Sequence, residues 1–199
     1  MLRAKLKNAI LYRIWCIFVD PPFAPLTKRI AQTLPKFSRQ TVLQIGTNDG
    51  DRDDPISPLL KRRRMWRGIL VEPLPNYMKQ LKDHYGKDKR FSFEQVAIGV
   101  DDGMRKFFHI CEDARHSPDW KDYFDRIGSL DKNSLIINLG DRLDAMEKHI
   151  VESDVQVMTI KTLLEKNQVR KVDAIIVDAE GRAIARRSCP RFILCIDFR

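Results

Sequence analysis

The chain has 199 residues, of which 43% are hydrophobic and 32% charged, a balance typical of one soluble domain with its own core. Its net charge of +9 could serve an anionic partner, but a solvated basic face explains it more simply. The densest basic run, KRRRMWR at 61–67, holds one aromatic residue and no RNA-binding signature, so we expect no nucleic-acid partner. No two of the four cysteines have C-x-x-C spacing, so we expect free thiols, no metal site and a cytoplasmic location.

Residues 1–38 are expected to be a helix followed by a proline-rich linker or wrapping segment. The apolar stretch at 9–19 is interrupted by Arg13 and is shorter than the ~20 residues that a bilayer span needs. No small-residue cleavage site follows it. We therefore predict an amphipathic helix packed on the domain. Peripheral membrane contact through residues 1–19, with Trp15 and Phe18 at the lipid surface, is the alternative.

From residue 39 the sequence predicts one domain in which strands and helices alternate. Expected strands are TVLQI (41–45), RGILVEP (67–73), RFSFEQVAIGV (90–100), VDAIIVDAEG (172–181) and RFILCIDF (191–198), with helices at 56–66 and 74–86. A further strand, GMRKFFHIC (103–111), is expected to pair with the third strand across a DDG turn, and 112–150 to be a helical insertion. Buried, unalternating strands separated by helices indicate an α/β fold with a parallel sheet covered on both faces.

The first strand ends in the turn G-T-N-D-G-D, at the sheet edge where such folds bind ligands. The turn lacks the G-x-G-x-x-G spacing that cradles a pyrophosphate. The acids in and after it would repel a diphosphate: Asp49, Asp51, Asp53 and Asp54. A cationic, hydroxyl-rich ligand such as S-adenosylmethionine fits better. Gly46 would allow close backbone approach, and Asn48 and Asp51 could bind the amino-acid end.

The second and third strands carry further candidates for the same ligand. Glu72, at the end of the second strand, could accept two hydrogen bonds from a ribose diol. Ala97 and Ile98 would lie near an adenine. Taken alone, Glu72 could equally be a surface acid before the turn at Pro73.

These segments resemble the FkbM family of S-adenosylmethionine-dependent methyltransferases. The resemblance rests on VLQIGTNDGD, GILVEPLPNYMKQL, VAIG before GMRKFF, GSLDKNSL, VMTIKTLLEK and VDAIIVDAEG, which cover about residues 40–181 in the order of the family. It implies a Rossmann-like methyltransferase fold and methylation of an oxygen, often on a sugar or glycan-related acceptor. The resemblance implies that Gly46, Asn48, Gly50 and Glu72 line the cofactor. With the candidates from the turn and the third strand, the predicted cofactor-binding residues are Gly46, Thr47, Asn48, Gly50, Asp51, Glu72, Ala97 and Ile98.

The resemblance also implies a D-x-E-G motif, and the acceptor should arrive there. Asp178 and Glu180 are therefore the candidate catalytic bases, although Asp178 could instead orient its loop. His109, His116 and His149 are weaker candidates. The insertion, with Trp120, Tyr123 and Phe124, could form a lid over the acceptor or a helical hairpin held together by these aromatic residues.

The chain departs from the family pattern at two places. Gln44 stands where the family often has Asp, so one charge that would attract the cationic end of the cofactor is lost. After Gly181 only eight residues precede Pro190, fewer than the ~10–12 of a parallel crossover. We therefore expect a sheet that is incomplete at the C-terminus, with one bare edge on RFILCI. Three functions stay open: an O-methyltransferase, an inactive cofactor-binding remnant, and a nucleotide-sugar-modifying Rossmann enzyme.

Overall fold

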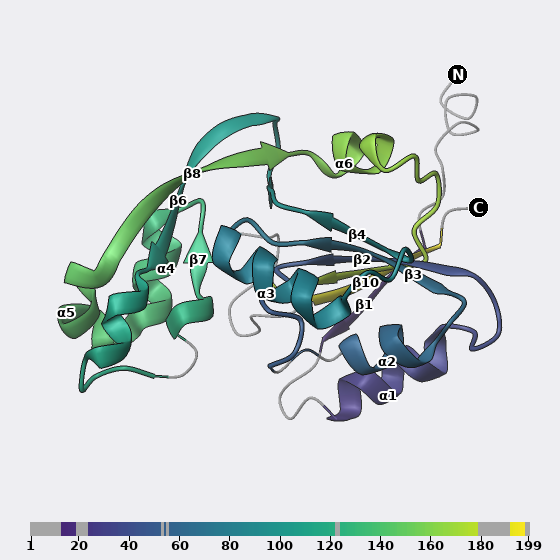
Figure 1. Cartoon of the computed structure of the whole chain (residues 1–199), viewed down its shortest axis with the longest axis horizontal. Helices are drawn as coiled ribbons and strands as arrows, with labels where there is room; N and C mark the ends of the chain where they lie inside the picture. Colours follow the sequence, from purple (N-terminus) through teal and green to yellow (C-terminus); the bar gives the residue numbers. More distant parts are fainter. Residues whose placement is uncertain are drawn as a thin grey trace, which may run out of the picture.

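The central sheet joins segments from the whole length of the chain. The structure is a computed structural model that describes residues 13–18, 24–52, 54, 56–121, 124–178 and 192–197. Its described strands form a six-stranded sheet in the order β1-β10-β9-β2-β3-β4 (Figure 1). These are β1 (Arg13–Phe18), β10 (Phe192–Asp197), β9 (Ala174–Val177), β2 (Gln40–Ile45), β3 (Trp66–Val71) and β4 (Phe91–Glu94). The strands β9, β2, β3 and β4 are parallel, so their carboxyl ends meet at one edge.

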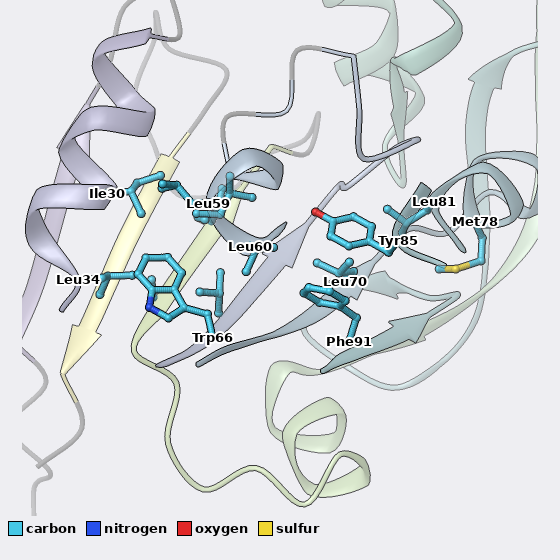
Figure 2. Close-up of a cluster of buried hydrophobic side chains, with 14 residues drawn as sticks. Ile30, Leu34, Leu59, Leu60, Trp66, Leu70, Met78, Leu81, Tyr85 and Phe91 are labelled. Carbon is cyan, nitrogen blue, oxygen red and sulfur yellow. The ribbon is translucent and has the colours of Figure 1, made fainter. Parts of the chain in front are cut away.

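Helices pack on both faces of this sheet, because its strands have apolar side chains on both faces. Helices α1 (Ala24–Thr33), α2 (Ser57–Arg62) and α3 (Pro75–Tyr85) cover one face, and α6 (Ile160–Lys166) covers the other. Figure 2 shows the first core, in which Trp66 and Leu70 of β3 lie against side chains of all three helices. Successive side chains of a strand point to opposite faces of the sheet. Val42 therefore packs in this core, and its neighbour Leu43 packs in the core under α6.

A second sheet lies beside the first and carries the insertion. Its order is β5-β8-β6-β7, formed by β5 (Ala97–Ile98), β8 (Ile150–Met158), β6 (Gly103–Ile110) and β7 (Gly128–Ser129). Between β6 and β8 the chain forms the short helices α4 (Lys132–Leu139) and α5 (Leu143–Met146), with 3-10 turns at Glu112–His116, Phe124–Arg126, Gly140–Arg142 and Glu147–His149. These elements enclose a core of their own around Phe124, Leu135 and Met146.

The predicted fold class is confirmed: this is an α/β structure of the Rossmann-like methyltransferase type, with helices on both faces of a largely parallel sheet. The division of the chain into a leading segment, a domain and an insertion stays a prediction. One predicted pairing is wrong. The expected third strand is split, since β4 joins the first sheet and β5 the second. The strand β6 then pairs with β8, which separates it from β5.

The predictions for the two ends of the chain also need correction. Residues 13–18, expected in a helix, form β1, and the expected linker contains α1. The strand β10 has no bare edge, because β1 pairs with one side of it and β9 with the other. Since β10 runs antiparallel to β9, it needs no crossover helix, and the length of the preceding connection does not limit it. Residues 179–191 lie outside the described residues.

Candidate functional site

The turn after β2 is shaped by three residues with positive φ. Gly46 has φ 77°, Asn48 φ 50° and Gly50 φ 72°. The backbone N–H groups of Gly46 and Thr47 both donate to the carbonyl of Val71, which ties the turn to the end of β3. Thr47 is buried, and its hydroxyl lies 3.3 Å from the carbonyl of Gln44 and 3.2 Å from that of Val71. Thr47 thus holds the turn, while Gly46 and Asn48 are half-buried at its surface.

Glu72 lies directly beside this turn and is only 3% exposed. One carboxylate oxygen accepts the N–H of Asn48 at 3.0 Å, and the other accepts the N–H of Leu74 at 2.9 Å. Burial raises the pKa of Glu72 to about 7, although both hydrogen bonds lower it. A carboxylate has about four lone-pair sites, so each oxygen can accept one further donor. The group is therefore fixed in place and keeps lone pairs for further donors.

Asp49 organises the second half of the turn. Its Oδ1 accepts the N–H groups of Asp51 and Arg52 at 3.0 Å each, and its Oδ2 accepts Nε of Arg52 at 2.6 Å. Burial would raise the pKa of Asp49, but the hydrogen bonds from Arg52 and the backbone outweigh it and hold this pKa below its ordinary value. Asp49 therefore stays charged at neutral pH and supports the loop from inside.

A second carboxylate, Asp54, lies behind the loop at the start of α2. Its Oδ1 accepts the N–H groups of Ile56 and Ser57 at 2.8 and 3.0 Å, and its Oδ2 accepts Nε2 of Gln44 at 3.1 Å. Burial is the main cause that raises the pKa of Asp54 to about 6, and the charge of Asp178 adds to the rise. Gln44 is 2% exposed, and its Oε1 has no hydrogen-bond partner among the described residues.

Asp178 follows β9, as the sequence predicts, and reaches the same edge. Its N–H donates to the carbonyl of Ile45 at 2.9 Å, so the chain after β9 lies against the start of the glycine turn. The structure therefore brings Asp178 together with Gly46 and Asp54. Glu180 and Asp53 lie outside the described residues.

The remaining predicted cofactor residues occupy different surroundings. Gly50 packs closely against α3, because a Cβ added to it would lie 2.6 Å from Leu81 and 3.0 Å from Tyr85. The side chain of Asp51 is 75% exposed, with one oxygen 3.8 Å from Nδ1 of His84. Ala97 is buried in a cluster that includes Leu74, two residues after Glu72.

Ile98 packs partly against the core under α6, on the opposite side from Ala97. The ligand-binding roles of all these residues stay predictions. Among the described residues, no group of three or more His, Cys, Asp or Glu side chains is placed to hold a metal ion.

The insertion contacts the loop that follows the glycine turn. A guanidinium N–H of Arg126 donates to the carbonyl of Arg52 at 3.3 Å, and Nδ2 of Asn76 donates to Glu112 at 2.9 Å. Phe124 is fully buried and makes an edge-to-face contact with Trp120, so these aromatic rings build the core of the insertion. The insertion therefore adjoins the candidate site through polar contacts.

Two of the three candidate histidines of this region, His109 and His149, have partners within the insertion and second sheet. His109 is half-buried, with Nε2 2.9 Å from the hydroxyl of Ser153, and burial lowers its pKa. Nδ1 of His149 lies 3.8 Å from the Cys111 thiol, and His116 is exposed.

Three residues that support the candidate site are not predicted to do so from the sequence. Asp49 and Asp54 were counted only as repulsive acids, and Arg126 was not noted. A signal existed for Asp54, because an acid two and three residues ahead of backbone N–H groups at a helix start is a common capping pattern. No local pattern identifies Arg126, since its partner is 74 residues away.

A parallel sheet with a glycine turn and a buried acid at the carboxyl ends of adjacent strands is typical of α/β proteins that bind a ligand at that edge. The family model described as the methyltransferase FkbM domain matches residues 44–184. The chain therefore belongs to the FkbM methyltransferase family. No curated protein and no solved structure matched the chain. Within the described residues, no helix has the length and apolar character needed to cross a membrane.

The residues present fit the S-adenosylmethionine that the family suggests. Among its described residues the site offers carboxylates and no cluster of backbone N–H groups left for a phosphate, because Glu72, Asp49 and Asp54 already accept those of their loops. A buried carboxylate with spare lone pairs suits a ribose diol, and a loop rich in acids suits a cation.

Proposed function

We propose that the chain is an S-adenosylmethionine-dependent methyltransferase that methylates a hydroxyl group of a sugar- or glycan-related acceptor. The family makes it a methyltransferase. The observation that carries the choice of cofactor is Glu72, a buried carboxylate whose two oxygens are fixed by Asn48 and Leu74 beside a glycine turn. The sugar hydroxyl rests on the family resemblance.

In this proposal the cofactor lies along the carboxyl ends of β2 and β3. Glu72 would accept hydrogen bonds from the two ribose hydroxyl groups, Gly46 would let the backbone approach closely, and Asn48 and Asp51 would hold the amino-acid end. Ala97 and Ile98 lie toward the adenine. The bound cofactor supplies an electrophilic methyl group at this edge. The protein aligns the acceptor with it, and such positioning can contribute ~7–11 kcal/mol.

The acceptor hydroxyl must lose its proton as the new C–O bond forms. Asp178 and Glu180 are the proposed bases, because the acceptor arrives at the end of β9 in this arrangement. A positioned base contributes about 10²–10⁴-fold to the rate. The support for Asp178 is its place beside Gly46 and Asp54, where its N–H donates to Ile45.

The proposal includes a cytoplasmic location and a small-molecule or glycan acceptor as the partner of the site. Support for a reducing compartment is the free thiol of Cys111. The acids around the glycine turn, Asp49, Asp51 and Asp54, argue against the alternative nucleotide-sugar enzyme, since their negative charge would repel a diphosphate.

Calorimetric titration with S-adenosylmethionine, S-adenosylhomocysteine and NAD tests the proposal. We expect both sulfur nucleosides to bind and NAD to bind more weakly. Tighter NAD binding would contradict the methyltransferase assignment. Transfer of an isotope-labelled methyl group to a panel of sugars and glycans then tests turnover, and binding without transfer to any acceptor would identify a remnant that has lost activity.

A further inference from the structure

The edge of the sheet opposite the candidate site carries a cluster of basic loops that the proposed function does not use. Here the segments that lead into β2, β3, β4 and β9 meet. Nε1 of Trp66 donates to the carbonyl of Pro35 at 3.3 Å, so the loop before β2 lies against the loop before β3. The N–H of Thr41 donates to Asp173 at 2.8 Å, which adds the loop before β9.

Arg90 joins the loop before β4 to the same edge. One guanidinium nitrogen of Arg90 donates to the carbonyls of Leu60 and Arg63 at 3.0 Å each and to that of Trp66 at 3.1 Å. These hydrogen bonds fix the loops relative to one another. The cations on them therefore form one surface, which we call the basic edge: Lys36, Arg39, Arg62, Arg64, Arg67 and Lys89, all exposed.

Acids are scarce on these loops and already engaged. In residues 28–41, 61–67, 86–90 and 167–173 the acids are Asp88 and Asp173. Asp88 pairs with Arg90 at 2.6 Å, and Asp173 pairs with Lys171 at 2.7 Å. The basic edge thus has a strong net positive charge in water, and opposite charge on a partner would complement it.

Two apolar side chains stand among these cations. Phe37 is 83% exposed and Met65 is 46% exposed, whereas most large apolar side chains of this domain are buried. Nζ of Lys36 lies 4.9 Å from the centre of the Phe37 ring, so a cation and an exposed aromatic ring share one place. Cations with interspersed Phe and aliphatic side chains are typical of surfaces that bind anionic lipid at the membrane interface.

We propose that the basic edge docks the protein on the surface of an anionic phospholipid bilayer, with Phe37 and Met65 entering the headgroup layer. Nucleic acid is the other polyanion to consider. Binding of single strands relies on several exposed rings on which successive bases stack. The basic edge offers Phe37 alone, because Trp66 is fully buried. An aliphatic residue such as Met65 has a role in lipid and none in base stacking.

This docking leaves the candidate site accessible from the water. The parallel strands run from the basic edge to the glycine turn, so the two lie at opposite ends of β2 and β3. Strands of six residues are roughly 20 Å long at ~3.3 Å per residue. The site then faces away from the bilayer and receives acceptors from solution or from molecules that extend from the membrane.

Co-sedimentation of the full chain with phosphatidylcholine vesicles, with and without phosphatidylserine, tests the proposal. We expect binding only with phosphatidylserine and release as salt is raised. The test variant is Lys36→Gln/Arg64→Gln/Lys89→Gln, one substitution in each of three loops. At about 1 kcal/mol for each cation near the surface, its affinity should fall on the order of 100-fold. Phe37→Ala should weaken binding several-fold without a change in charge.

The matched control is Lys121→Gln/Lys132→Gln/Lys148→Gln, which removes three exposed cations from the insertion. It lowers the net charge equally and should keep vesicle binding. Equal loss in both triple variants, or no binding of the unmodified chain to phosphatidylserine vesicles, would overturn the proposal. Tighter binding to a labelled single-stranded RNA than to vesicles would overturn it in favour of nucleic acid. Because the lipid and salt comparisons use the unmodified chain, they decide the matter even if a variant fails to fold.

Discussion

The two edges of the parallel sheet are chemically opposite. At the carboxyl edge, Glu72, Asp49 and Asp54 accept backbone N–H groups and are largely removed from water. At the amino edge, Arg90 and Trp66 donate to backbone carbonyls while the neighbouring cations stay in water. One edge thus holds desolvated charge of one sign, and the other holds solvated charge of the opposite sign.

The direction of the βα units explains this difference. Each helix that follows a parallel strand begins at the carboxyl edge and ends at the amino edge. Helix α2 begins after Asp54, whose Oδ1 accepts two N–H groups there, and ends with Lys61 and Arg62. Acids near helix starts and bases near helix ends both compensate the helix dipole. The fold therefore favours acids at the carboxyl edge and bases at the amino edge.

The largest expected effect is at Glu72. Glu72→Ala removes the proposed partner of the ribose diol and should weaken binding of S-adenosylmethionine by ~1.5–3 kcal/mol, the range for hydrogen bonds to a charged group. It also leaves the N–H groups of Asn48 and Leu74 without their acceptor, at a cost of ~1–3 kcal/mol each where they remain buried. Calorimetry and thermal unfolding measure the two losses.

Glu94→Ala is the matched control for Glu72→Ala. Glu94 is also buried at the end of a parallel strand, but it binds Nζ of Lys166 and Nδ2 of Asn167 at 2.6 and 2.8 Å. Its loss should lower stability and leave cofactor affinity unchanged. Equal affinity losses in the two variants would show that any buried acid at this edge acts through folding alone.

The amino edge should respond in the opposite way. Arg90→Ala removes the guanidinium group, one nitrogen of which donates to three carbonyls. It should lower the free energy of unfolding by ~1.5–3 kcal/mol and leave cofactor affinity unchanged. Lys89→Ala, at the exposed neighbouring position, should change stability little. Denaturant unfolding of both variants tests this, and a fall in cofactor affinity for Arg90→Ala would show that the edges are coupled.

Gly50→Ala tests how tightly the glycine turn is held against α3. Its φ of 72° is costly for a residue with a side chain, by ~1–2 kcal/mol, and the new Cβ would lie 2.6 Å from Leu81. Gly86 also has a positive φ, 64°, but a new Cβ there would have no atom within 4 Å, so Gly86→Ala is the matched control. Both variants should lose stability, but only Gly50→Ala should shift the turn and weaken cofactor binding. Equal cofactor affinity in the two folded variants would show that the turn does not depend on this contact.

The surroundings of the glycine turn follow from local sequence, whereas the pairing of the strands does not. The glycine turn and the acid at the end of β3 are short motifs, and the N–H of Asn48 does meet Glu72. The partner of Gln44 was not predictable, since its amide contacts Asp54 only once the loop has folded back.

The wrong predictions concern which strands pair. The apolar run at 9–19 suits a helix as well as a strand. Only its pairing with β10 shows that residues 13–18 form the strand β1. The run at 90–100 shows no break between β4 and β5, although they belong to different sheets. Strand partners far apart in the chain leave no local trace in either case.

A pH dependence with two opposite signs should arise from the one carboxyl group of Glu72. The folded pKa of Glu72 is about 7, above its ordinary value of 4.5, so the folded chain binds its proton more tightly than the unfolded chain does. This contribution to stability is full below pH 4.5 and is lost as pH rises through 7. Cofactor affinity should change in the other direction, because only the ionised carboxylate can accept hydrogen bonds from both ribose hydroxyl groups. It should fall up to tenfold, about 1.4 kcal/mol, for each unit of pH below 7.

Melting temperature and calorimetric affinity across this range, compared with Glu72→Gln, measure both slopes. Asp54, with a pKa of about 6, leaves a residual stability slope in that variant. If Glu72→Gln keeps the full pH dependence of cofactor affinity, Glu72 is not the group that binds the diol.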